Sequence, residues 1–375
     1  MRFAIVVGTR PEIIKMSPVI KECERRNISH FVVHTGQHYD YLLDKVFFEE
    51  LGLKPESMNL NVGSGTHAET TSKVMVGIEK VFMKTKPDAV LVEGDTNTGL
   101  AAGITSIKLH IKLAHIEAGL RSYDRRLPEE YNRILIDHIS HFLFPPTKLT
   151  EQNLCDEGVA NHDMLYTDGI YKQIVRMTGN TIVDAINQNL NKAEKVSDKL
   201  NELGLRKSGY FLLTAHREEN VDTKARLIEI LKGIDRSTRV YDMPVVFPIH
   251  PRTHKRIKEF GLEKLLKRNK RLKLIKPVGF FDMLNLEANA KLIFTDSGGV
   301  QEESCSLRIP CVVLRDRTDR IESVKVGASK LTGCDSSKIY GAAMEFLESG
   351  GNWKNPFGDG KAAKRIFKTL KNHLQ

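Results

Sequence analysis

The amino-acid sequence predicts an α/β protein of two domains, each with a parallel β-sheet covered by helices on both faces. Short, almost continuously apolar strands alternate with helical stretches, which is typical of a buried parallel sheet. This alternation begins again after a helical, lysine-rich stretch at residues 179–207, which we interpret as the interdomain connection. The length of 375 residues also exceeds the usual size of one hydrophobic core.

The two halves of the chain contain similar sets of elements. In the first half, we expect strands at residues 2–7, 30–34, 88–93, 112–116 and 141–144, and helices at 11–26, 39–51, 66–83, 96–109 and 129–139. In the second half, we expect strands at residues 210–213, 245–248, 272–275, 292–295 and 311–314. The first domain is expected at residues 1–178 and the second at 179–360, with a C-terminal helix, 361–375, packing back on the first. Asn180 or Thr181 is the expected N-cap of the connecting helix.

The composition excludes several classes of protein. The net charge of +10 comes from lysines scattered over helices with few aromatic residues among them, which argues against nucleic-acid binding. The five cysteines contain no CxxC pair, so we expect neither a metal site nor a disulfide framework. No apolar run approaches the length of a membrane span, and the N-terminus enters a strand at once. We therefore expect a cytoplasmic protein without a membrane partner.

A candidate anion site lies in the sequence KLIFTDSGGVQEES, residues 291–304. It predicts a strand, a tight turn over residues 296–299 and a helix from Val300. Backbone N–H groups beside glycines at a helix N-terminus bind anions, and the Ser297 hydroxyl can add to a phosphate. Glu302 and Glu303 would repel that phosphate, so at least one must face another group, such as the hydroxyls of a ribose. Equally, this stretch can be an ordinary strand-to-helix turn with acids that favour the helix dipole.

Titratable side chains follow several of the expected strands, where ligands bind in such folds. They include Arg10, Asp95, Glu117, Glu129, His216 and His250. Helix capping could account for any one of these residues, but it does not explain why so many titratable residues follow the strands. Carboxylates gathered in a cleft between two domains raise each other's pKa, as acid–base catalysis needs.

A second glycine motif, GSGTHA at residues 63–68, fits the GxGxxA pattern of dinucleotide-binding proteins. The preceding residues 57–62 are polar and form a poor buried strand. We therefore do not expect NAD to bind at this motif.

An ordered set of motifs resembles the non-hydrolysing UDP-N-acetylglucosamine 2-epimerases over nearly the whole chain. The motifs are GTRPEIIKMSPV (8–19), GDTNT (94–98), HIEAGLRS (115–122), PEEYNR (128–133), GNTIVDA (179–185), AHRE (215–218), DSGGVQEES (296–304) and NPFGDG (355–360). The resemblance implies a GT-B-like fold of two Rossmann-like domains with UDP held in the cleft between them. It also implies a homodimer active in cell-surface polysaccharide synthesis.

The resemblance also implies roles for individual residues. The implied catalytic residues are Asp95, Glu117, Glu129 and His216, with Glu130 as the alternative to its neighbour Glu129. The implied UDP-sugar contacts are Arg10, Lys15, His250, Ser297, Gly298, Gly299, Glu303 and Arg320. Among these, Glu303 would meet the ribose, and Ser297 with the glycine backbone would meet phosphate. A regulatory UDP-N-acetylglucosamine site is implied around Gln37 and His38.

The implied reaction is elimination of UDP to 2-acetamidoglucal and re-addition with inversion at C2, without metal or NAD. Three alternatives remain open. A hydrolysing epimerase would release free N-acetylmannosamine, and a GT-B glycosyltransferase would need an acceptor. A UDP-sugar sensor would keep residues 297–303 but would not need Asp95, Glu117 and Glu129 together.

Overall fold

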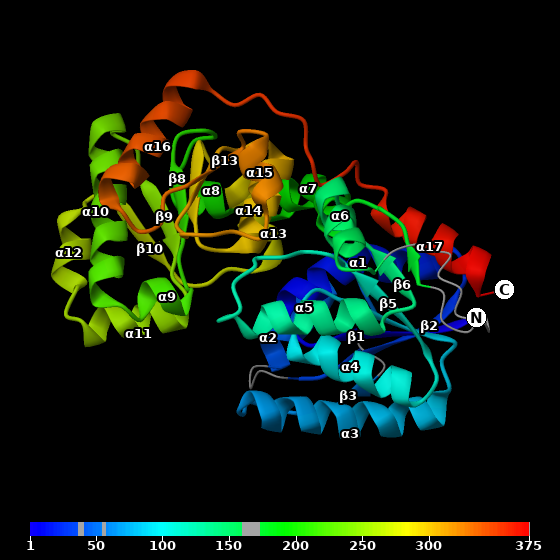
Figure 1. Ribbon diagram of the computed structural model, residues 1–375. Helices are drawn as coiled ribbons and strands as arrows, with labels where there is room; N and C mark the ends of the chain where they lie inside the picture. Colours follow the sequence, from blue (N-terminus) through cyan, green and yellow to red (C-terminus); the bar gives the residue numbers. More distant parts are fainter. Residues whose placement is uncertain (37–40, 55–57, 160–172, 375) are drawn as a thin grey trace. The chain divides into compact units, whose positions relative to one another are not determined.

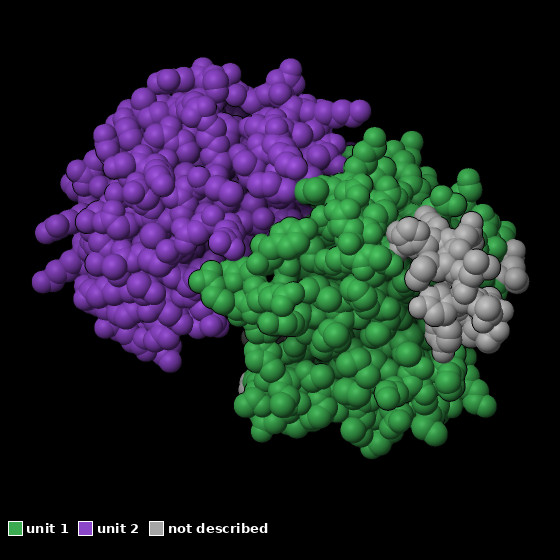
Figure 2. Space-filling view, viewed as in Figure 1, with its two compact units in different colours: residues 1–188, 357–375 green, residues 189–356 purple. Residues whose placement is uncertain are grey.

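The computed structural model describes residues 1–36, 41–54, 58–159 and 173–374, with side chains in the second range from residue 46 onward. The chain forms two compact units, unit 1 of residues 1–188 with 357–375 and unit 2 of residues 189–356 (Figures 1 and 2). Each unit has its own parallel sheet, so the predicted α/β class with two parallel sheets is confirmed. No helix in the described ranges is long and apolar enough to cross a membrane.

Unit 1 is built on a seven-stranded sheet in the order β3-β2-β1-β4-β5-β6-β7, with parallel neighbours throughout. Its strands are β1 (Arg2–Val7), β2 (Ser29–His34), β3 (Met58–Asn59), β4 (Ala89–Glu93), β5 (Lys112–Ile116), β6 (Phe142–Phe144) and β7 (Ile174–Val175). Its helices are α1 (Arg10–Arg25), α2 (Tyr41–Glu50), α3 (His67–Thr85), α4 (Asn97–Lys108), α5 (Pro128–Ile139), α6 (Lys148–Asp156) and α17 (Ala362–His373). The strand order reverses between β1 and β4, which is where a ligand crevice is expected.

The C-terminal helix belongs to unit 1 although it follows the whole of unit 2 in the sequence. Helix α17 packs against α1, and the Phe367 ring lies 5.8 Å from the Phe3 ring of β1. Helix α7 (Thr181–Val196) contains the residue at which the chain passes from unit 1 to unit 2. The side chain of Asn180 caps this helix by accepting a hydrogen bond from the backbone N–H of Ile182 at 3.0 Å.

Unit 2 is built on a six-stranded parallel sheet in the order β10-β9-β8-β11-β12-β13. Its strands are β8 (Phe211–Thr214), β9 (Val245–Pro248), β10 (Leu272–Ile275), β11 (Leu292–Thr295), β12 (Cys311–Val313) and β13 (Ser329–Leu331). Its helices are α8 (Lys199–Glu202), α9 (Glu218–Val221), α10 (Lys224–Tyr241), α11 (Pro251–Glu259), α12 (Glu263–Arg268), α13 (Phe280–Ala288), α14 (Gly298–Leu307), α15 (Ile321–Lys325) and α16 (Ser336–Ser349). Here the order reverses between β8 and β11.

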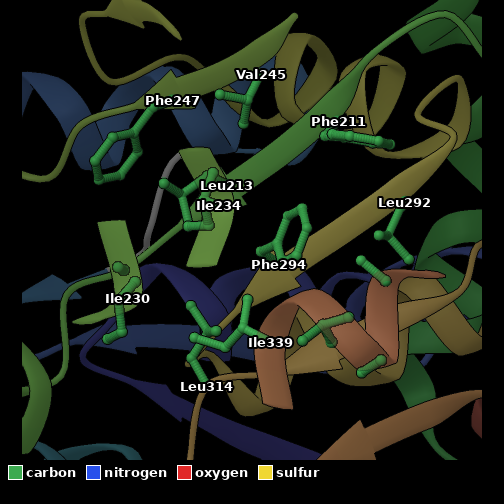
Figure 3. Close-up of a cluster of buried hydrophobic side chains, with 14 of the residues drawn as sticks. Phe211, Leu213, Ile230, Ile234, Val245, Phe247, Leu292, Phe294, Leu314 and Ile339 are labelled. Carbon is green, nitrogen blue, oxygen red and sulfur yellow. The ribbon is translucent and has the colours of Figure 1, made fainter. Parts of the chain in front are cut away.

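The core of unit 2 holds this second reversal point rigidly. Buried side chains of β8 and β11 meet those of α10 and α16, and the rings of Phe211 and Phe294 lie edge to face at 5.8 Å (Figure 3). Ile234 and Ile339 bring the two helices onto the same face of the sheet. A closely packed core holds the strand ends in fixed positions. It therefore also holds the polar residues that follow each strand.

The expected strands are all present, with ends that shift by a residue, but three further strands are not predicted. The edge strands β3, β7 and β13 have only two or three residues each, too few to show an alternating pattern. Helix α6 is also not predicted, and α14 begins at Gly298 rather than Val300. The first residues of the helix expected at 39–51 lie outside the described residues.

Candidate active site

A buried group of charged side chains lies at the carboxyl ends of β4 and β5 in unit 1. Lys15 Nζ lies 3.1 Å from Glu93 Oε1 and forms an ion pair with Glu117 Oε2, which also accepts a hydrogen bond from Asn180 Nδ2 at 3.0 Å. All three charged side chains are at most 7% exposed. Burial, reinforced by the charge of Glu117, raises the pKa of Glu93 well above its usual value. Two carboxyl groups that share one ammonium group can hold and release a proton.

Glu117 itself has an unusual backbone. Its φ of 69° lies in the left-handed region, which residues other than glycine adopt rarely. Such strain is concentrated at functional sites, where the surrounding structure enforces it. Glu117 is the first residue after β5, and its strained backbone supports it as a candidate catalytic residue.

The Glu12 side chain hydrogen-bonds to the loop after β1 and to the loop after β4. These two strands lie where the strand order of the unit 1 sheet reverses. The Glu12 carboxylate accepts hydrogen bonds from the N–H groups of Gly8 and Thr9 at 3.0 and 2.7 Å, and from Thr96 Oγ1 at 2.7 Å. Burial nevertheless outweighs these donors and raises the pKa of Glu12 to about 7. Gly8 is required beside it, because a Cβ there would lie 2.2 Å from Thr98 Oγ1.

Asp95 and the two adjacent glutamates of α5 occupy different environments. Asp95 forms an ion pair with Arg133, whose Nη1 lies 3.2 Å from Glu130 Oε2. Glu130 is buried and accepts hydrogen bonds from the N–H and hydroxyl of Ser122 at 2.9 and 2.8 Å. Glu129 is half-buried and makes no hydrogen bond or ion pair with any residue that the structure describes. Glu130 therefore supports the fold, and Glu129 is the one available to a ligand.

The remaining predicted contact of unit 1 is Arg10, at the start of α1. Its guanidinium lies 5.4 Å from the centroid of the Phe47 ring, in a cation–π contact. The predicted regulatory positions Gln37 and His38 lie outside the described residues.

In unit 2, Asp296 connects the ends of β8 and β11 at the reversal point. Its carboxylate is fully buried and accepts hydrogen bonds from the backbone N–H groups of His216 and Arg217, each at 3.0 Å. The Nδ1 atom of His216 lies 3.2 Å from Asp296 Oδ1, and the His250 ring lies 5.5 Å from the His216 ring. Although burial opposes ionisation, the hydrogen bonds and charge of His216 hold the pKa of Asp296 below its usual value. The sequence predicts only a turn at Asp296, whereas the structure shows that its carboxylate orients His216.

The predicted anion turn is the first turn of α14. Ser297 is its N-cap, and the hydroxyl accepts a hydrogen bond from Val300 N at 3.4 Å. A Cβ at Gly298 would lie 3.4 Å from Arg320 Nε, so this glycine allows a close approach of the arginine. Gly299 adds a second backbone N–H without a Cβ. The arrangement brings the guanidinium of Arg320 close to the backbone of the first turn of α14, as an anion site requires.

The two glutamates of α14 face different partners. Glu302 is fully buried, and its Oε1 lies 3.1 Å from Arg320 Nε. Glu303 is half-buried and hydrogen-bonds to Glu287 of α13, a carboxyl that is 1% exposed. Burial, together with the charge of Glu303 and this hydrogen bond, raises the pKa of Glu287 well above its usual value. The hydrogen bond from Glu287 can hold the Glu303 side chain in place.

Each unit thus gathers its share of the predicted residues at the carboxyl end of its own sheet. Unit 1 carries Arg10, Lys15, Asp95, Glu117 and Glu129; unit 2 carries His216, His250, Ser297, Gly298, Gly299, Glu303 and Arg320. No group of three or more His, Cys, Asp or Glu in the described ranges is arranged to hold a metal ion.

The chain is similar in sequence and in fold to known proteins. The family model for UDP-N-acetylglucosamine 2-epimerase matches residues 21–371. A UDP-N-acetylglucosamine 2-epimerase of Methanocaldococcus jannaschii is 51% identical over 99% of both chains, and one of Methanococcus maripaludis is 48% identical over 97% of both. The crystal structure of the M. jannaschii enzyme with UDP-GlcNAc and UDP superposes with a TM-score of 0.89 at 50% identity, covering 99% of this chain and 100% of that chain. The GT-B-like class is thereby confirmed.

Proposed function

The chain belongs to the UDP-N-acetylglucosamine 2-epimerase family, and on that premise we propose that it interconverts UDP-N-acetylglucosamine and UDP-N-acetylmannosamine without net hydrolysis. The observation that carries this proposal is the buried group at the carboxyl ends of β4 and β5. There Glu93 and Glu117 share Lys15. Proton exchange at C2 needs such carboxyl groups, and burial raises the pKa of Glu93 well above its usual value.

The proposed chemistry proceeds by elimination and re-addition. A carboxylate of unit 1 takes the C2 proton, the C2–H electron pair forms a C1–C2 double bond, and the C1–O bond breaks to release UDP. UDP then adds back to the 2-acetamidoglucal at C1 while a proton is delivered to the opposite face of C2. Proton donors and acceptors are therefore needed on both faces of the sugar. Asp95, Glu117 and Glu129 are the groups that we assign to these transfers.

Unit 2 is proposed to bind the UDP portion. The N–H groups of the first turn of α14 and the guanidinium of Arg320 support binding of the diphosphate, with Ser297 at the same turn. His216, oriented by Asp296, adds positive charge when protonated and stabilises the departing UDP. Glu303 is assigned to the ribose hydroxyls, with Glu287 supporting it.

The test is direct conversion of each sugar nucleotide by the dialysed protein, without nicotinamide and with a chelator present. We expect UDP-N-acetylmannosamine to form from UDP-N-acetylglucosamine, and the same final mixture to arise from either side. Chromatography separates the two epimers from UDP and free sugar. Release of free N-acetylmannosamine would instead indicate a hydrolysing epimerase, and a requirement for an added acceptor would indicate a glycosyltransferase.

A further inference from the structure

Arg315 of unit 2 is a buried arginine in an unusual environment. It lies two residues after the end of β12, and its backbone carbonyl accepts a hydrogen bond from Gly333 N at 3.1 Å. The side chain is 4% exposed. Its Nε and Nη1 atoms are buried and make no hydrogen bond with any described residue. Leaving buried donors of a charged group unsatisfied costs free energy, so this arrangement needs a reason.

Two acids form ion pairs with Arg315 but do not hydrogen-bond to its Nε and Nη1 atoms. Glu219 Oε1 lies 3.5 Å from Nε, and Asp319 Oδ1 lies 3.5 Å from Nη1. Asp319 is shared, because its other oxygen pairs with Arg320. Burial, together with the nearby charge of Arg217 and Arg320, holds the pKa of Arg315 below its usual value. This part of unit 2 therefore concentrates positive charge.

Another buried arginine of the same chain has a hydrogen-bond partner for each of its side-chain nitrogens. Arg121 of unit 1 is about as buried, but its guanidinium lies 2.8 Å from Asp137 Oδ2 and 2.6 Å from Glu157 Oε2. It also donates to its neighbour's backbone carbonyl at 2.7 Å. An arginine that serves only the fold is expected to be satisfied in this way. Arg315 is not satisfied in this way.

The position of Arg315 connects it to the first turn of α14. Strands β11 and β12 are neighbours, and Leu314 N donates to Thr295 O at 2.8 Å, so the residues after each strand emerge side by side. Asp319 then links Arg315 to Arg320, which packs against Gly298. The turn and the two arginines thus lie at the same end of the sheet.

We propose that Arg315 is a further binding residue for the diphosphate of the nucleotide sugar, acting with Arg320 and the first turn of α14. This inference rests on the proposed function, because it takes a nucleoside diphosphate as the ligand. Phosphate oxygens are acceptors that match the planar donors of a guanidinium better than two carboxylates held at 3.5 Å. Contact with the diphosphate would also stabilise the charge that the leaving UDP gains.

The test compares UDP with uridine, which has the same base and ribose but no phosphate. Arg315→Met should weaken UDP binding at least 10-fold in calorimetry and leave uridine binding, followed by NMR titration, unchanged. Arg315→Lys keeps the charge but loses the planar donors, and should fall between the wild type and Arg315→Met. Arg271→Met is the matched control, since Arg271 pairs with Asp242 just before β10, at the opposite end of the sheet.

The outcomes separate this inference from the proposed function. A wild-type protein that does not bind UDP defeats the proposed function and this inference with it. Wild-type UDP binding that persists unchanged in folded Arg315 variants defeats only the role of Arg315, as does equal weakening of UDP and uridine. Thermal melting identifies folded variants. If Arg315→Met does not fold, Arg315→Lys alone decides. Weaker binding of UDP with unchanged binding of uridine would then support the role of Arg315.

Discussion

Replacing Glu117 by glutamine is expected to reduce turnover at least ~10²-fold, the loss typical when a general acid or base is removed. The amide retains the shape and much of the hydrogen bonding of the carboxylate but cannot take a proton. Lys15 keeps Glu93 as a partner 3.1 Å away, so the ammonium is not left without a counter-charge. Asp95→Asn and Glu129→Gln should lose turnover to a similar extent. In all three variants, UDP affinity should change far less than turnover.

Glu130→Gln provides the matched control for Glu129→Gln, because the two residues are adjacent but only Glu130 is buried against Ser122. We expect Glu130→Gln to lower the melting temperature and Glu129→Gln to leave it nearly unchanged. Initial rates and melts on the same samples separate catalysis from folding. Three well-folded amide variants with near-normal turnover would refute the catalytic assignment and favour a UDP-sugar-binding protein without this chemistry.

Glu12 should make the stability of the chain depend on pH in the opposite sense to an ordinary ion-paired carboxylate. Its pKa is about 7 in the folded chain against 4.5 for an unperturbed glutamate side chain, so between these values the unfolded chain releases a proton that the folded chain retains. The free energy of unfolding therefore falls as the pH rises through this window, at up to about 1.4 kcal/mol per pH unit. Over the whole window, Glu12 should account for about 3 kcal/mol.

Comparison of the wild type with Glu12→Gln isolates this contribution, since glutamine cannot ionise. Denaturant unfolding at pH 4.5 to 7.5 should show the wild type losing stability relative to the variant as the pH rises. Glu69→Gln is the control, because Glu69 is an exposed carboxyl with a lowered pKa and is ionised throughout most of this window. Parallel pH profiles for the wild type and Glu12→Gln would show that Glu12 ionises normally in the folded chain.

Much of the fold is predictable because parallel strands buried on both faces form continuous apolar runs. Strands such as β1 and β11 have the predicted bounds, since their apolar runs end sharply at polar or glycine positions. The edge strands have no such pattern, because so few of their residues pair. Helix α6 is polar in sequence, and its capping by Thr147 and Thr150 is a local signal that hydrophobic periodicity does not register.

The site was predictable in its residue types more than in its pairings. The strand-end rule identifies acids such as Glu117, but nothing in the sequence shows that Lys15 links it to Glu93. Likewise, the sequence shows that Glu302 and Glu303 cannot both face a phosphate, but it does not reveal Arg320 as the partner of Glu302. Arg315 was missed because its significance lies in hydrogen bonds that it does not make, which only the packed structure reveals. Pairings between distant segments are properties of tertiary packing.

The most direct test of the proposed chemistry is proton NMR of UDP-N-acetylglucosamine incubated with the protein in deuterium oxide. Removal of the C2 proton by a carboxylate, followed by delivery of a solvent-derived proton, predicts that deuterium enters C2. The C2 proton signal should disappear from the sugar nucleotides as UDP-N-acetylmannosamine accumulates to equilibrium. UDP-N-acetylmannosamine that forms with the original proton still at C2 would contradict proton exchange with solvent, and with it the elimination and re-addition proposed for this site.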